Sequence, residues 1–166
     1  MVLLRKPKAE DIIEIKYLYE SSITFHQPWT CAPINYENYI QQDGRYFACA
    51  SDTGKIVGAF HISGILRGYF QSAFLGYEVF HPYQGKGYMS KGLKLIITEA
   101  FDNLNLHRLE ANIQPDNFAS IKLVANNGFI KEGFSRNYLK VSGGEWKDHE
   151  RWAIVNANWS EKVDNI

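Results

Sequence analysis

Residues 77–88 read Tyr-Glu-Val-Phe-His-Pro-Tyr-Gln-Gly-Lys-Gly-Tyr and decide the fold. The first part is strand-like up to Pro82, which ends strand pairing because it has no N–H to donate. Gly85 and Gly87 follow, and apolar residues then recur at helical spacing as far as Asn103. The stretch predicts a strand that passes through a glycine-containing loop into a long helix.

The start of this expected helix is a candidate anion site. The first backbone N–H groups of a helix have no partner within it, and the helix dipole adds partial positive charge there. Gly85 and Gly87 have no side chain to keep a phosphate from the backbone, and Lys86 supplies a counter-charge. The glycines alone are equally compatible with a plain strand-to-helix turn. Two other phosphate-binding motifs are not matched, because Tyr88 replaces the Ser or Thr of a Walker loop and Ser90 replaces the last Gly of GxGxxG.

The flanking sequence predicts alternating strands and helices. Residues 24–33 and 68–76 are interpreted as loops, and Ser142-Gly143-Gly144 as a hairpin turn. The expected strands are residues 2–5, 46–51, 55–63, 77–80, 108–113, 129–141 and 146–155, and the expected helices begin near residues 9, 36, 85 and 117. This order predicts an α/β (α+β) fold with a mixed central sheet of about six to seven strands flanked by about four helices.

Composition excludes several classes of function. The chain has 166 residues, 45 % of them hydrophobic and 22 % charged, which suits one globular domain covering residues 1–166. Lys plus Arg and Asp plus Glu both total 18, and this neutral balance argues against a protein that binds nucleic acid by neutralising phosphates. No apolar run reaches the roughly 18 residues of a membrane span, and the N-terminal apolar run is too short for a signal peptide. We therefore expect a cytoplasmic protein that contacts neither a membrane nor nucleic acid directly.

The cysteines and histidines show no metal or disulfide pattern. Cys31 and Cys49 do not form a CxxC-type pair, so free thiols are expected. The five histidines lack HExxH or Cys-partner spacing. No metal is expected.

Several segments resemble the GNAT N-acetyltransferases. Residues 84–89, QGKGYM, resemble the Q/R-x-x-G-x-G/A signature of this family, with Met89 at the position where the family has Gly or Ala. Residues 107–117 (HRLEANIQPDN), 126–134 (NNGFIKEGF) and 143–149 (GGEWKDH) are similar to the RimJ/RimL-like, ribosomal-protein-alanine N-acetyltransferase branch. The resemblance extends from Leu3 to Trp159.

The resemblance implies a GNAT fold whose sheet is splayed between the fourth and fifth strands, where acetyl-CoA enters. In this family the glycine loop holds the pyrophosphate of the coenzyme, and backbone N–H groups of the neighbouring strand polarise the thioester carbonyl. The residues implied to bind acetyl-CoA are Val79, Phe80, Gln84, Gly85, Lys86, Gly87, Tyr88, Met89, Ser90, Asn117 and Ser120.

The resemblance also implies Ser120 and Glu110 as catalytic residues. Asn117 is a candidate helix N-cap, and Ser120 is then the third helical residue, also a common place for a surface serine. Val124 stands where many family members have a catalytic tyrosine, so Ser120 is the candidate acid for the departing thiolate. Glu78 and Glu110 are the candidate bases, although each is also compatible with an exposed strand carboxylate. The resemblance favours Glu110.

The expected reaction is direct transfer of acetyl to a primary amine. No Cys or Ser is accompanied by the His and acid of a triad, so no acetyl-enzyme is expected. By resemblance, the acceptor is the α-amino group of a protein N-terminus, such as that of a ribosomal protein. One alternative is a small amine or an antibiotic, and another is a non-catalytic, ribosome-associated module that binds coenzyme A. A monomer and a homodimer are both compatible with the sequence.

Overall fold

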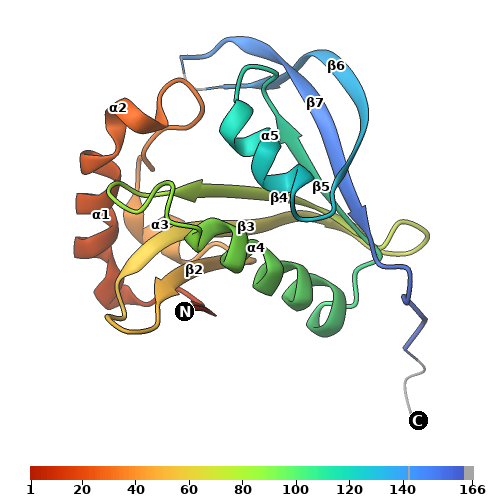
Figure 1. Ribbon diagram of the computed structural model, residues 1–166, viewed down its shortest axis with the longest axis horizontal. Coiled ribbons are helices and arrows are strands. Elements are labelled where there is room, and N and C mark those ends of the chain that lie inside the picture. The colour runs from red at the N-terminus through yellow and green to blue at the C-terminus, as the bar shows by residue number, and fades with distance from the viewer. Residues whose placement is uncertain (142, 163–166) are drawn as a thin grey trace.

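The computed structural model describes residues 1–141 and 143–162, so the predicted turn residue Ser142 lies outside the described residues. A single mixed sheet has the strand order β1-β2-β3-β4-β5-β7-β6 (Figure 1). Its strands are β1 (Val2–Arg5), β2 (Arg45–Ala50), β3 (Ile56–Leu66), β4 (Ser72–Val79), β5 (Arg108–Ile113), β6 (Ile130–Lys140) and β7 (Trp146–Val155).

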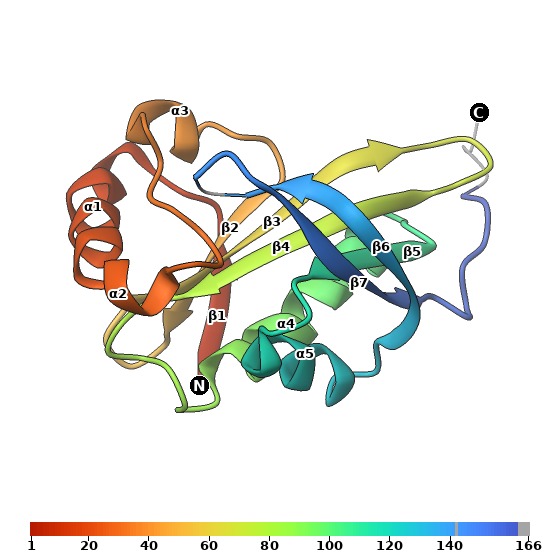
Figure 2. The same ribbon diagram turned by 90° about the horizontal axis from the view of Figure 1, so that it is seen from above.

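Helices cover both faces of this sheet. They are α1 (Ile12–Ser21), α2 (Ile23–His26), α3 (Tyr36–Ile40), α4 (Tyr88–Thr98) and α5 (Phe118–Ala125), with a 3-10 turn at Ala9–Asp11 and a π-helical turn at Glu99–Asn103. Figure 2 shows α3 on one side of the sheet and α4 and α5 on the other. The mixed sheet with flanking helices confirms the predicted fold class.

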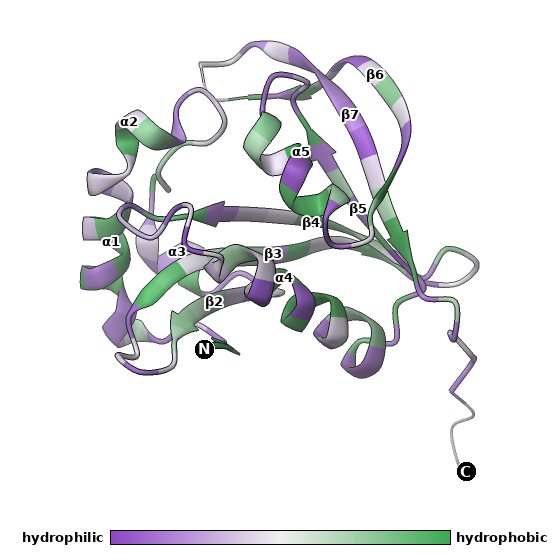
Figure 3. Cartoon of the chain, in the orientation of Figure 1, coloured by the Kyte–Doolittle hydropathy of each residue, from purple (hydrophilic) through white to green (hydrophobic). Residues whose placement is uncertain are grey.

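Strand alternation divides the interior into two hydrophobic cores. All six residues of β2 are buried, and successive side chains point to opposite faces of the sheet. Phe47 and Cys49 pack in the core beneath α1 and α3, while Tyr46 and Ala48 pack in the core beneath α4. Figure 3 shows that β7, by contrast, is largely hydrophilic at the outer part of the sheet.

The sheet opens between β4 and β5. These strands run parallel and pair only at Ser72↔Arg108, Ala73↔Leu109 and Phe74↔Glu110. Beyond these positions β4 continues to Val79 and β5 to Ile113 without pairing to each other. The splay predicted between the fourth and fifth strands is therefore confirmed.

Two local predictions were wrong. Residues 24–33 were expected to form a loop, but α2 occupies Ile23–His26, which brings the helix count to five. This short helix is held by packing, since His26 is buried with its ring against Tyr19 and Phe80. The fourth strand was expected to begin at residue 77 but begins at Ser72, because pairing with β3 outweighs the low strand propensity of this glycine-containing segment.

Close packing of α4 on the sheet gives a stability prediction. An alanine usually stabilises a helix by about 1 kcal/mol relative to glycine. A Cβ at Gly92, however, would lie 2.8 Å from Cε2 of the fully buried Phe60 ring. We expect Gly92→Ala to lower the free energy of unfolding by about 1–3 kcal/mol, measured by urea denaturation.

Gly76→Ala is the matched control for this prediction. A Cβ at Gly76 meets nothing within 4 Å, so its effect should stay within about 0.5 kcal/mol. A more stable Gly92→Ala protein would contradict the close approach of α4 to β3.

Candidate active site

A cavity of about 790 Å³ lies at the opening between β4 and β5. This volume is within the range of about 300–1,000 Å³ typical of small-molecule sites. Its lining comes from helices on both faces of the sheet, with His26 of α2 on one side and Ser120 of α5 on the other. The cavity therefore passes through the splayed part of the sheet.

The glycine loop forms one end of this cavity. Gly85 and Gly87 have φ angles of 73° and 77°, in the left-handed region that favours glycine. A Cβ at either glycine would meet nothing within 4 Å, so open space lies directly above the backbone. Lys91 N–H donates to Gly87 O at 3.3 Å, which is the first turn of α4. The backbone N–H groups before Lys91 lie at the N-terminus of this helix, where they have no partner within it. These features fit a phosphate group bound to backbone amides.

The Met89 side chain fills space that is left open by Gly58, a residue distant in the sequence. Its side chain is buried, and a Cβ at Gly58 of β3 would lie 2.4 Å from its sulfur. Gly58 thus provides the volume that lets a large residue follow the loop. The sequence of the loop, residues 84–89, does not by itself indicate that Gly58 makes room for Met89.

The first turn of α5 brings Ser120 to the cavity. Asn117 Oδ1 accepts the Ser120 N–H at 3.3 Å, which confirms Asn117 as the N-cap. The Ser120 hydroxyl lies 2.6 Å from the hydroxyl of Tyr77, which reaches it from β4. Burial raises the pKa of Tyr77, so this phenol keeps its proton. Tyr77 can therefore donate to Ser120 and leave the Ser120 proton available.

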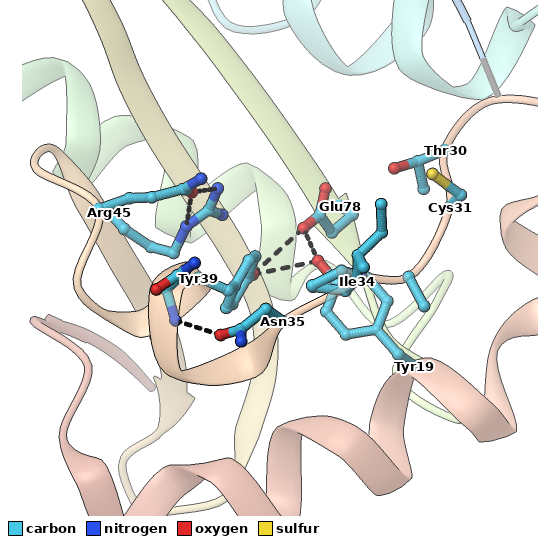
Figure 4. Close-up of a pocket in the computed structure, with 12 residues that line it drawn as sticks. Tyr19, Thr30, Cys31, Ile34, Asn35, Tyr39, Arg45 and Glu78 are labelled. Atoms are coloured by element: carbon cyan, nitrogen blue, oxygen red, sulfur yellow. Dashed lines mark hydrogen bonds between the residues drawn. The ribbon is translucent and has the colours of Figure 1, made fainter. Parts of the chain in front are cut away.

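Glu78 lines this cavity and also a second one of about 400 Å³, shown in Figure 4. The hydroxyl groups of Tyr19 and Tyr39 both donate to Glu78 Oε1, Tyr39 at 3.4 Å. Burial raises the pKa of both phenols, so both remain donors. No hydrogen bond within residues 1–141 and 143–162 engages Glu78 Oε2, which leaves this oxygen able to accept a proton.

Comparison with known proteins assigns the chain to a family. The family model "Acetyltransferase (GNAT) domain" matches residues 1–130. The chain belongs to the GNAT acetyltransferases. It is therefore an acyltransferase, and GNAT enzymes use acetyl-CoA as the acetyl donor.

Individual relatives of this GNAT chain support the expected branch. It is 36 % identical over 109 residues to the ribosomal protein uS5-alanine N-acetyltransferase of Escherichia coli, a match that covers 66 % of the chain but only 56 % of that enzyme. A ribosomal-protein-S5-alanine acetyltransferase from Vibrio fischeri superposes with a TM-score of 0.84 at 27 % identity and covers 96 % of both chains. Spermidine N-acetyltransferase from Vibrio cholerae shares the fold, with a TM-score of 0.77 at 20 % identity, 95 % coverage of this chain and 97 % of that one.

Most predicted coenzyme-binding residues of this acetyltransferase line the larger cavity. They are Val79, Gln84, Gly85, Gly87, Tyr88, Met89, Ser90, Asn117 and Ser120. Lys86 is not among the lining residues and has its ammonium group 5.8 Å from the Tyr83 ring centroid. Phe80 is fully buried outside the lining, and its N–H donates to Val57 O at 3.0 Å.

The structure separates the two candidate bases. Glu110 forms an ion pair with Arg108 at 2.9 Å and lines neither cavity. Arg108 also pairs with Glu132, so the Glu110 carboxylate is part of a partly buried ion-pair group of three residues. A catalytic role for Glu110 stays a prediction, whereas Glu78 is the carboxylate that shares a cavity with Ser120.

Sequence reasoning missed several residues of this site. Tyr77, Tyr19, Tyr39 and Asn127 were given no role, although Asn127 bonds Ser90 at 3.2 Å and so joins α5 to the start of α4. Their partners in these contacts lie 37 to 59 residues away in the chain. No short-range spacing could have indicated them.

Within the described residues, no group of three or more His, Cys, Asp or Glu side chains is placed to hold a metal ion. Among those same residues, no helix has both the length and the hydropathy needed to cross a membrane.

Proposed function

We propose that this acetyltransferase transfers acetyl directly from acetyl-CoA to the N-terminal α-amino group of a protein. Three features lie in one cavity and carry the proposal: the backbone amides at the N-terminus of α4, the Ser120–Tyr77 pair and the Glu78 carboxylate. The first fits a diphosphate, the second can supply a proton, and the third can accept one.

The thioester would lie between the donor and acceptor ends of the cavity. Val79 is the candidate for polarising its carbonyl, because Val79 lines the cavity and its own C=O bonds His26 Nε2 at 2.7 Å. In an extended strand the N–H and C=O of one residue point to the same side, so the Val79 N–H faces the side on which His26 contacts the Val79 C=O. The N–H of Phe80 is already donated within the sheet.

Glu78 and Ser120 are the two residues that carry out the proton transfers. The amine nitrogen attacks the thioester carbonyl carbon, and its excess proton passes to Glu78 Oε2. As the C–S bond breaks, Ser120, held by its hydrogen bond with Tyr77, donates its proton to the departing thiolate and recovers one from water. An α-amine has a pKa of about 8, so roughly a tenth is already neutral at pH 7 and the rest must lose a proton before it attacks.

The charge of the cavities does not favour a polyamine. Among the residues that line the two cavities, Glu78 is the single carboxylate, whereas Arg45 and Lys122 are cationic. A polyamine carries several positive charges and would find only one partner there. The related uS5-alanine N-acetyltransferase supports a protein acceptor, and the shared fold of a spermidine enzyme keeps a small amine as the alternative.

Incubation with acetyl-CoA tests the proposal. We expect an alanine-starting peptide to gain one acetyl group, read by mass spectrometry, and the same peptide with a blocked N-terminus to gain none. Acetylation of spermidine but of no peptide would favour the small-amine alternative. Coenzyme binding without transfer to any amine would indicate a non-catalytic module.

A further inference from the structure

A buried arginine lines the smaller cavity together with Glu78. Arg45 is 9 % exposed and lines the 400 Å³ cavity of Figure 4. Its Nε donates to Gln42 Oε1 at 3.0 Å, and its guanidinium carbon lies 3.8 Å from the Tyr39 ring centroid. Gln42 and Tyr39 thus hold the guanidinium in place without neutralising its charge.

Arg45 differs from the paired arginines of this protein. Arg5 and Arg108 form ion pairs with carboxylates although their side chains are 27 % and 25 % exposed. Arg45 is more buried, yet it takes part in none of the ion pairs found within the described residues. A buried charge is costly unless a partner compensates it. The natural partner for an exposed edge of this guanidinium in a cavity is an anionic group of the bound ligand.

His61 and Gln42, two neighbours of Arg45, add no positive charge beside its guanidinium. His61 is its register partner on β3, and burial together with the Arg45 charge lowers the pKa of His61. His61 is therefore neutral at pH 7, and Gln42 is uncharged. The Glu78 carboxylate is the opposite charge that lines the same cavity.

Strand register gives the separation of the two charged residues. Arg45 pairs with His61, and His61 pairs with Gly76, two residues before Glu78 on β4. Two strand spacings of about 4.8 Å and two residue steps of about 3.4 Å place the two Cα atoms about 12 Å apart. The Tyr39 side chain contacts both charged groups, Arg45 through its ring and Glu78 through its hydroxyl, so these groups lie closer together than the two Cα atoms.

We propose that Arg45 binds a carboxylate of the acceptor while Glu78 receives its amine. The acceptor is then a primary amine that also carries a carboxylate, and this inference rests on the proposed function. A peptide advances at most about 3.3–3.6 Å per residue, so an acidic side chain at its second or third residue reaches from one group to the other. In a free α-amino acid both groups are attached to one carbon, too close together to span the cavity.

Peptide pairs test the inference on the unmodified protein. Alanine-starting peptides that differ only by Glu or Gln at position two, three or six are compared by their KM values. We expect the Glu peptide to have a KM about tenfold lower at position two or three, and the same KM at position six. Equal KM values for Glu and Gln at all three positions would overturn the inference, whether or not any variant folds.

Arg45→Gln then assigns the preference to this residue. The ratio of the two KM values should fall to about one in Arg45→Gln and be partly restored in Arg45→Lys, which keeps the charge but loses the planar donor geometry. Arg67→Gln is the control, because Arg67 is exposed at the β3–β4 connection and should leave the ratio unchanged. A ratio that survives Arg45→Gln would overturn the assignment.

The same assays separate this inference from the proposed function. Failure to acetylate any peptide would count against the proposed function, whereas acetylation of Glu and Gln peptides with equal KM would count against the role of Arg45 alone. Free glutamate is included as a third acceptor. Its Arg45-dependent acetylation, without peptide acetylation, would support the carboxylate site and assign it to a small acceptor.

Discussion

Replacing Ser120 with alanine should lower kcat about 100-fold and leave the affinity for acetyl-CoA almost unchanged. The hydroxyl is positioned by Tyr77 at 2.6 Å and by the first turn of α5, and general acids typically contribute about 10²–10⁴ in rate. The small hydroxyl is expected to act mainly when the thiolate departs, so it adds little to ground-state binding. Initial rates and calorimetric titration with acetyl-CoA would measure the two effects.

Tyr77→Phe is the matched control for this prediction. It keeps the aromatic ring in the core and removes only the hydroxyl that contacts Ser120. We expect a loss in kcat smaller than that of Ser120→Ala, because Ser120 would still carry its proton. A Ser120→Ala enzyme with unchanged kcat would remove Ser120 from the reaction.

Glu78→Gln should lower kcat/KM about 100-fold at pH 7 for an α-amine acceptor. Glutamine keeps an acceptor for the Tyr19 and Tyr39 hydroxyls but cannot take the proton of the amine. The neutral fraction of an α-amine rises from about a tenth at pH 7 to about nine tenths at pH 9. The deficit should therefore shrink by up to about tenfold over this range, which a pH series of initial rates would measure.

Glu110→Gln is the companion measurement, because the family resemblance favoured Glu110. With its carboxylate paired to Arg108 and outside both cavities, we expect a much smaller loss of activity than in Glu78→Gln. The reverse order of the two variants would restore Glu110 as the base and contradict the role proposed for Glu78.

Local sequence signals accounted for the donor side of the site. Pro82, the two loop glycines and the apolar repeat of α4 are consecutive in the chain, so strand end, turn and helix start could be derived from them. The same holds for Asn117, whose capping bond reaches only three residues ahead. These features depend on backbone conformation over a few residues, which the sequence encodes directly.

The acceptor side could not be derived in this way. Glu78 was a candidate, but its advantage over Glu110 depends on Tyr19 and Tyr39, which come from separate helices. The burial of Arg45 likewise depends on how α3 packs over β2. Alternation within β5 gives Glu110 and Asn112 the same direction but does not tell which face carries the cavity. Tertiary packing decides these positions.

Because β4 and β5 pair at only three positions, the two substrates can reach the cavity from different sides of the sheet. The larger cavity is lined by α5 and the start of α4 on one face of the sheet and by α2 on the other, so it can be reached from two sides. Donor and acceptor therefore need not share a route, and both can be present before any bond changes. Spent coenzyme can likewise leave on one side while the acetylated product leaves on the other.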